Sequence, residues 1–349
     1  MEDNLREPEA GRQTKFGLLV RGILVVSALF LALGCEETQK RSEAPTLTGP
    51  SETSGLTAQA YRIILEGLND TNPFIRVKAI EVVAETGQIK LMPKVQRLAG
   101  DEFAPVRFAA ALAIGDMEYS FGVSAIKQLL RDKDLNVKIA ASYAMVRLGS
   151  PRYVEVLRRA IASKDQTVRA NAAFLLGKCG DKEALKLLYW ALQDKDSEDK
   201  VVYQAAESIA MLQDDRIYPK LWTMLISAYA DVRVTGIKAM GTLGTPEARN
   251  ALITMLDDKV LEVRLAAAGQ LGKLGDKTGE PEVLDVFRRN LTAGMEATDR
   301  ARVNILAALA IGQIATPSLR EYLPQLLSDE SKTVRMAAAA AVLRSRIKD

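Results

Sequence analysis

An arginine that recurs at a regular spacing is the residue type of this chain with the most evident chemical potential. Alignment on the Arg of the segment 263–275 gives nine anchor positions: Arg76, Arg107, Lys138, Arg169, Tyr203, Arg233, Arg264, Asn304 and Arg335. Aspartate precedes five of these anchors by six residues, as Asp70, Asp101, Asp132, Asp258 and Asp329. Guanidinium groups bind phosphates and carboxylates in a bidentate way. A row of them could therefore form a stripe that binds an acidic ligand.

The residues around each anchor show that the arginines belong to a structural repeat. Five of the eight intervals between anchors are 31 residues long, and the residue just before every anchor is Ile or Val. Three residues after the anchor stands Ala in eight cases and Gly236 in the ninth. A small residue at a fixed offset lets two helices approach closely, and a period of 20 to 50 residues is typical of stacked supersecondary units.

The composition excludes several classes of function. The 349 residues include no histidine, which rules out Ser-His-Asp and Cys-His nucleophiles and His-based metal sites. The formal net charge of +3 is too small to indicate nucleic-acid binding. Cys35 and Cys179 are the only cysteines. No cofactor or metal motif stands out, and no pair of carboxylates suggests a catalytic site.

Each repeat reads as helix, turn, helix. Apolar residues at helical spacing predict first helices over residues 56–68, 122–130, 154–162, 183–192, 248–256 and 319–327. Glycine follows five anchors by eleven residues, at Gly87, Gly149, Gly180, Gly244 and Gly275, where it would end the second helix in the left-handed conformation. The Asp residues could cap the second helix or the turn before it.

The pattern D-x-x-x-x-V-R-x-x-A, almost complete from Asp258 to Gly275, resembles the short bacterial HEAT repeats called PBS-lyase HEAT-like. The resemblance implies an all-α fold, an α-solenoid of about nine HEAT-like repeats in a right-handed superhelical array over residues 56–349. It also implies that the anchor Arg is structural and meets a turn Asp of its own or a neighbouring repeat. Relatives of this kind serve many partners, so the resemblance says little about function.

Residues 1–35 are predicted to be an export signal. The apolar run 22–33 is too short to span a bilayer, which needs about 20 residues, but it suits a signal peptide. The site 31–35 (LALGC) resembles the lipobox of bacterial lipoproteins, which implies lipidation of Cys35. An ordinary signal with an incidental cysteine is the alternative.

Residues 36–55 are rich in Ser, Thr, Pro and charge, and we expect a disordered tether. Signal, tether and solenoid together predict a protein of the bacterial cell envelope that is lipid-anchored to a membrane, either the outer membrane or the periplasmic face of the inner membrane.

A helical wheel suggests a partner-binding face on the second helices. Offsets +2, +5 and +9 from the anchor are left for the concave surface, where they predict an apolar ridge edged by charge. The candidate partner-binding residues are Leu112, Tyr143, Phe174, Arg147 and Lys178. If the wheel is off by one position, these residues belong to the core.

Two irregularities mark the second half of the array. Residues 189–229 hold six aromatics, Tyr189, Trp190, Tyr203, Tyr218, Trp222 and Tyr229, which favours a repacked core over an amphipathic pocket. The interval from Arg264 to Asn304 is 40 residues long, which a longer first helix or a protruding loop would explain.

The sequence therefore predicts a membrane-tethered scaffold that binds a protein or peptide on its concave face, with no enzymatic activity. The alternatives are a structural component of an envelope complex and, less favoured, a bilin lyase-like or other enzyme.

Overall fold

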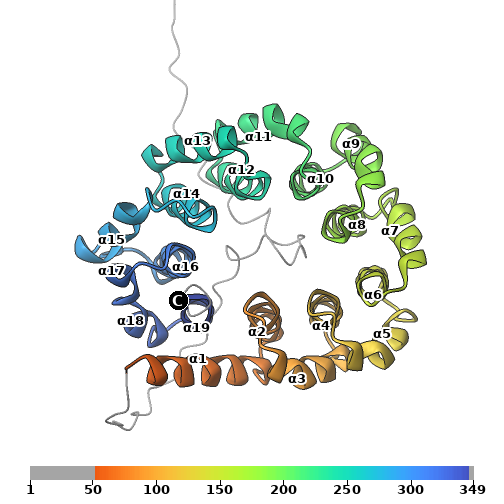
Figure 1. Ribbon diagram of the computed structural model, residues 1–349, viewed down its shortest axis with the longest axis horizontal. Coiled ribbons are helices and arrows are strands. Elements are labelled where there is room, and N and C mark those ends of the chain that lie inside the picture. Colours follow the sequence, from red (N-terminus) through yellow and green to blue (C-terminus); the bar gives the residue numbers. More distant parts are fainter. Residues whose placement is uncertain (1–51, 346–349) are drawn as a thin grey trace, which may run out of the picture.

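The computed structural model describes residues 52–345, and this part of the chain is all helical. Nine inner helices face the centre of the molecule in Figure 1, within the described residues. They are α2 (Pro73–Glu85), α4 (Ala104–Asp116), α6 (Leu135–Arg147), α8 (Gln166–Cys179), α10 (Asp199–Met211), α12 (Ala230–Leu243), α14 (Leu261–Lys273), α16 (Ala297–Ile314) and α19 (Lys332–Ser345). The predicted array of HEAT-like repeats is confirmed.

Shorter helices form the outer layer, except for the long α1. They are α1 (Glu52–Leu68), α3 (Met92–Arg97), α5 (Val123–Leu129), α7 (Val154–Ala160), α9 (Leu185–Gln193), α11 (Tyr218–Leu225), α13 (Pro246–Thr254), α15 (Glu280–Arg288), α17 (Pro317–Arg320) and α18 (Leu323–Leu327). Several begin with a single 3-10 turn, such as Ser120–Gly122 before α5. The first helix starts four residues before the predicted boundary at Leu56.

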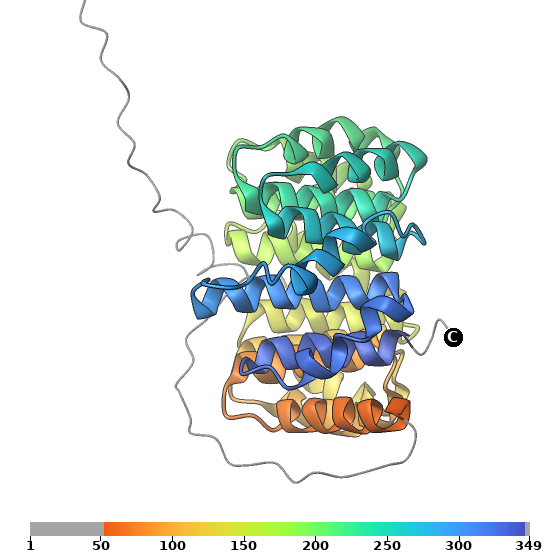
Figure 2. The same ribbon diagram turned by 90° about the vertical axis from the view of Figure 1, so that its left-hand side faces the viewer.

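The array closes on itself into a ring, which the sequence analysis did not predict. Each inner helix packs on the next one, and the last, α19, packs on α1 and α2 at the start of the array. Figure 1 shows the ring along its axis, and Figure 2 shows it from the side. First and last repeats, far apart in sequence, are therefore neighbours.

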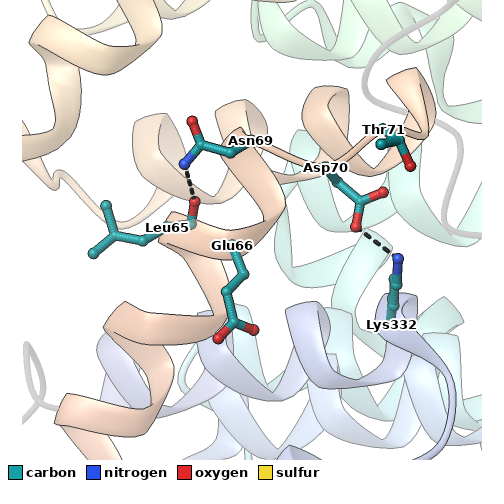
Figure 3. Close-up of a pocket in the computed structure, with 6 residues that line it drawn as sticks. All are labelled: Leu65, Glu66, Asn69, Asp70, Thr71 and Lys332. Carbon is teal, nitrogen blue, oxygen red and sulfur yellow. Dashed lines mark hydrogen bonds and ion pairs between the residues drawn. The ribbon is translucent and has the colours of Figure 1, made fainter.

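The seam between the first and last repeats combines close packing with ion pairs. A Cβ atom on Gly67 of α1 would lie 2.4 Å from Met336 Cε of α19, so glycine permits the close approach of these two helices. Lys332 Nζ lies 2.8 Å from Asp70 Oδ2, beside a shallow depression at the seam (Figure 3). Arg344 Nη2 lies 3.0 Å from Glu85 Oε2.

The inner helices end in a left-handed residue at the same offset. The backbone φ is positive at Gly87, Gly149, Gly180, Gly244 and Gly275, as predicted. The equivalent residues of other repeats, Glu118, Gln213 and Ala315, adopt the same conformation without being glycine. The turn that follows each inner helix therefore has one geometry, whatever residue occupies it.

One predicted anchor is off by one residue. Inner helices of regular length begin three residues before the anchor, and α10 begins at Asp199, which places its anchor at Val202. Val201, like the residue before most other anchors, is fully buried, whereas Tyr203 is partly exposed. The choice of Tyr203 was wrong because two valines in succession, Val201 and Val202, both fit the position before the anchor.

The long interval before Asn304 does not lengthen the outer helix, which spans only nine residues in α15. It lengthens the inner helix instead, since α16 has 18 residues, and it adds the turn at 289–296. Of the two explanations offered by the sequence, the longer first helix is wrong.

The residues predicted to form the signal peptide, Cys35, and most of the segment predicted to be a tether lie outside the described residues. Among the helices of residues 52–345, none combines the length and the apolar character that crossing a bilayer requires.

Closure can be tested by cross-linking across the seam. In a background without the two native cysteines, Asp70→Cys and Lys332→Cys should be joined within one chain by a short bismaleimide, because the native side chains are in contact although 262 residues apart. The control pair is Asp70→Cys with Lys164→Cys, which places the second thiol in the turn between α7 and α8, three repeats along the array, and should give no such product. Cross-links formed only between chains would show that the array is open in solution.

Candidate functional site

The anchor arginines form bridges between the turns of successive repeats. Arg107 Nε and Nη2 donate to the two carboxylate oxygens of Asp132 at 2.7 and 2.9 Å, while Nη1 donates to the backbone carbonyls of Asp101 and Glu102. The same arrangement recurs for Arg76 with Asp101 and for Arg233 with Asp258. These guanidinium groups are largely buried and their donors are in use, so the structural role implied by the resemblance is confirmed.

The Arg–Asp bridges lower the pKa of aspartates that they bind. Hydrogen bonds from Arg107 hold the pKa of Asp132 below its usual value, and those from Arg169 do the same for Asp194. Each Asp also accepts a backbone N–H two residues later, as Asp101 does from Phe103. The Asp residues therefore cap turns, as predicted, and no stripe of free arginines is left for an acidic ligand.

The bridge varies along the array. Arg264 pairs with Glu282 instead of an Asp 25 residues later, and at the next anchor Asn304 Nδ2 donates to Asp329 Oδ2. Lys138 and Val202 stand at two further anchors, and the position 25 residues later holds Ser163 and Ser227 instead of an acid.

The predicted apolar ridge on the concave face is not exposed. Leu112, Tyr143 and Phe174 have 5%, 1% and 2% of their surface exposed and belong to the core. The Tyr143 ring lies over Gly115 of α4, and its hydroxyl donates to Asp116 Oδ1 at 2.5 Å. The prediction of an exposed ridge was wrong, because neighbouring inner helices pack closely enough to cover these side chains, as α4 does at Gly115 for Tyr143.

The two predicted charged residues are engaged in the structure. Lys178 Nζ lies 2.8 Å from Asp116 Oδ2, two repeats away, and 5.6 Å from the centre of the Phe174 ring. Arg147 pairs with Glu118 at 2.6 Å and is partly exposed. Both belong to a charged network above the buried Tyr143 and Phe174.

A different set of apolar side chains is exposed, and we call it the aromatic surface: Trp190, Trp222, Ile226 and Tyr229. Ile226 and Tyr229 are 67% and 65% exposed, and the two tryptophans about 40%. Trp190 lies near the end of α9, and Ile226 and Tyr229 lie in the turn before α12, so all three face the same rim of neighbouring repeats. Tyr189, Tyr203 and Tyr218 pack against the core. Of the six aromatic residues between positions 189 and 229, three therefore pack against the core, and Trp190, Trp222 and Tyr229 are exposed.

The aromatic surface coincides with an interrupted bridge. Ser227 replaces the bridging acid, and the turn that carries it exposes Ile226 and Tyr229. A shallow depression beside this turn is lined by Leu225, Ile226, Ser227, Ala228, Arg233, Thr254, Met255, Asp257, Asp258 and Lys259. The sequence signal for this site was the aromatic density of residues 189–229 combined with the missing Arg.

Seven charged residues of five inner helices gather at the centre of the ring, and we call them the central charge cluster. They are Lys78, Glu81 and Glu85 of α2, Glu207 of α10, Lys238 of α12, Lys273 of α14 and Arg344 of α19. Lys238 lies across the ring from Glu81 yet close enough to influence its ionisation (Figure 1). Burial raises the pKa of Glu81 to about 7, although Lys78 and Lys238 oppose the shift.

The sequence of the repeats is matched by a family model. The model for HEAT repeats matches residues 95–167, 159–234 and 224–302, which together make up more than half of the chain. This chain belongs to the HEAT-repeat proteins. Within the HEAT array, the matched segments include every Arg–Asp bridge described above except the one made by Arg76.

Two solved structures are similar to this chain at low sequence identity. Human deoxyhypusine hydroxylase is 18% identical, with a TM-score of 0.38 over 75% of this chain and 97% of its own. The complex of CpcE and CpcF of phycocyanin lyase from Nostoc sp. PCC7120 is 17% identical, with a TM-score of 0.44 over 70% of this chain and 97% of its own. No curated protein sequence matches significantly.

The described residues include no group of His, Cys, Asp and Glu side chains that could hold a metal ion.

The raised pKa of Glu81 predicts a pH-dependent stability. An acid whose pKa is raised on folding binds its proton more tightly when folded, so the wild type should lose stability as pH rises from about 4.5 through 7. The difference corresponds to about 3 kcal/mol at most. Glu81→Gln should remove this slope in urea titrations at pH 5 and pH 8. Parallel slopes in variant and wild type would show that Glu81 titrates normally.

Proposed function

We propose that this HEAT ring is an interaction scaffold of the bacterial cell envelope that binds a protein partner at the aromatic surface. The observation that carries the proposal is the exposure of Trp222, Ile226 and Tyr229 at the interrupted bridge, with Trp190 exposed on the neighbouring repeat. Trp and Tyr dominate the binding energy of protein interfaces, and clustered exposed apolar side chains mark such sites.

The position of the surface supports binding without rearrangement of the ring. Arg169 Cζ lies 4.4 Å from the centre of the Trp190 ring, which fixes the indole before a partner arrives. A side chain that is already ordered loses less entropy on binding. The rigid ring presents the surface at its rim, where a large partner can reach it.

The tether to a membrane is a second part of the proposal. The lipobox-like sequence ending at Cys35 and the polar segment after it support a lipoprotein held at a membrane surface, with the ring as its folded part. We propose no enzymatic activity and no nucleic-acid binding for the ring.

Partner binding can be tested by co-purification from detergent extracts with identification by mass spectrometry. The double variant Ile226→Ser/Tyr229→Ser should recover at least tenfold less of a stoichiometric partner than the wild type. Both side chains are more than half exposed, so the free energy of unfolding should change by no more than about 0.5 kcal/mol per site.

The matched control is Phe121→Ser, which removes an aromatic that is 78% exposed at a turn between repeats. It should bind like the wild type. Equal losses in both variants, or a stoichiometric small molecule with no protein, would contradict the proposal.

Membrane attachment is tested separately with Cys35→Ser. This variant should fractionate with soluble proteins and carry no acyl label, whereas the wild type should be labelled and sediment with membranes. Unlabelled wild type would refute the lipoprotein assignment and leave the aromatic surface unaffected.

A further inference from the structure

Three successive turns at one end of the inner helices carry exposed apolar and basic side chains. They are the turns after α2, α4 and α6, at residues 86–91, 117–122 and 148–153, and we call them the C-terminal rim. Lys90, Phe121 and Arg152 each stand fourteen residues after an anchor, one in each turn. Because α2, α4 and α6 pack side by side, these residues occupy equivalent places in a row, about 10 Å apart.

The apolar residues of the C-terminal rim are open to solvent. Phe121 is 78% exposed, more than any other large apolar side chain of the described chain, and Ile89 is 51% exposed. The Phe121 ring packs only loosely on Tyr119, with 5.6 Å between the ring centres. A turn that projects a Phe into solvent adds nothing to the core, and such surface marks a place where another body is met.

The cations of the C-terminal rim are not neutralised by acids. Lys90 and Arg152 are exposed, and no ion pair of residues 52–345 includes either of them. The acids in or next to these three turns are engaged by other cations: Glu85 with Arg344, Asp116 with Lys178 and Glu118 with Arg147. The row from Lys90 to Arg152 is therefore positive, with an aromatic side chain between two cations.

Helix α1 begins at the same end of the ring. Its last turn lies at the opposite end, where Asp70 meets Lys332 at the start of α19. Tyr61, near its middle, already donates a hydrogen bond to Gln88 of the C-terminal rim. Nine residues, or about 14 Å of helix, separate Tyr61 from Glu52, the first residue of α1. The chain that leads from Cys35 therefore reaches the ring on the side of the C-terminal rim.

Cations beside an exposed aromatic side chain suit an anionic lipid surface, because the cations attract the headgroups and the apolar side chain enters the interface. We propose that the C-terminal rim lies on an anionic lipid bilayer, with Phe121 and Ile89 in the interface and Lys90 and Arg152 at the headgroup phosphates. The inference rests on the proposed membrane tether, which brings the ring to the bilayer by this side. A tether raises the effective concentration at the bilayer, so weak contacts are sufficient.

This orientation separates the two proposed surfaces. Ile226 and Tyr229 lie in the turn before α12, at the opposite end of the inner helices. A ring that rests on its C-terminal rim presents the aromatic surface away from the bilayer, where a protein partner can reach it. In detergent extracts no bilayer is present, so Phe121→Ser remains a suitable control for partner binding.

The test is co-sedimentation of the full chain carrying Cys35→Ser, which has no lipid anchor, with vesicles. Binding to phosphatidylcholine vesicles is the baseline, and it includes any contribution of the apolar run 22–33. Addition of phosphatidylglycerol should strengthen binding. Each cation near an anionic surface contributes about fivefold in affinity, so Lys90→Gln/Arg152→Gln should lose at least fivefold. The matched control is Arg131→Gln/Lys133→Gln, two exposed cations in the turn before α6, which should lose less than twofold.

Orientation can be read from an environment-sensitive fluorophore attached to a single thiol. In the background Cys35→Ser/Cys179→Ala, the emission of a label on Phe121→Cys should shift to shorter wavelength when anionic vesicles are added. A label on Tyr229→Cys, at the other end of the inner helices, should not shift.

Several results would overturn the proposal: equal losses in the two double variants, a folded Cys35→Ser protein that ignores phosphatidylglycerol, or a shift at Tyr229 with none at Phe121. So would a loss of the co-purified protein by Lys90→Gln/Arg152→Gln with unchanged vesicle binding, which would make the rim a protein site. A wild type without an acyl label contradicts the tether alone, because vesicle binding is measured without the lipid.

Discussion

The Arg–Asp bridge is the interaction on which this ring depends. One guanidinium group takes its position from two carbonyls of its own turn and holds the carboxylate of the next turn in two hydrogen bonds. A planar fork fixes direction as well as distance, which a Lys would not do. Buried ion pairs of this kind often add little net stability, and their best-supported role is to specify one geometry over others. Here they join successive repeats at Arg76, Arg107, Arg169 and Arg233.

The array closes because its last repeat packs on its first. The sequence contained signs of this closure that the repeat pattern alone did not reveal. Asp70 occupies the bridging position of the first repeat, where an open array has no preceding turn to pair with it. In the ring Lys332 of the last repeat meets it. Helix α19 is apolar almost all round, whereas the end of an open solenoid needs a polar face. Both features were visible in the sequence and become informative only when the two ends are considered together.

The fold was predictable because anchors, small residues and turn glycines recur, and an error at one repeat is corrected by the others. The site was not, because exposure depends on what stands opposite a helix. The wheel placed Leu112, Tyr143 and Phe174 correctly on one line, but the spacing within a helix does not show how closely the neighbouring inner helices pack, as α6 does against Gly115 of α4. The sequence analysis did not predict that Trp190 and Tyr229 are exposed, because aromatic residues in a helical repeat usually belong to the core. Only the missing bridge at Ser227 marked the turn before α12 as different.

Closure also restricts how such a protein can evolve. An open solenoid gains or loses a repeat at either end and changes only its length. In this ring the nine inner helices of the described chain pack one on the next, and the last packs on the first repeat. Deleting one would leave a gap of about 10 Å, the distance between packed helices, and adding one would leave no room for α19 beside α1. The number of repeats is thus fixed by geometry, and variation is confined to the loops, the rim and the side chains at the centre.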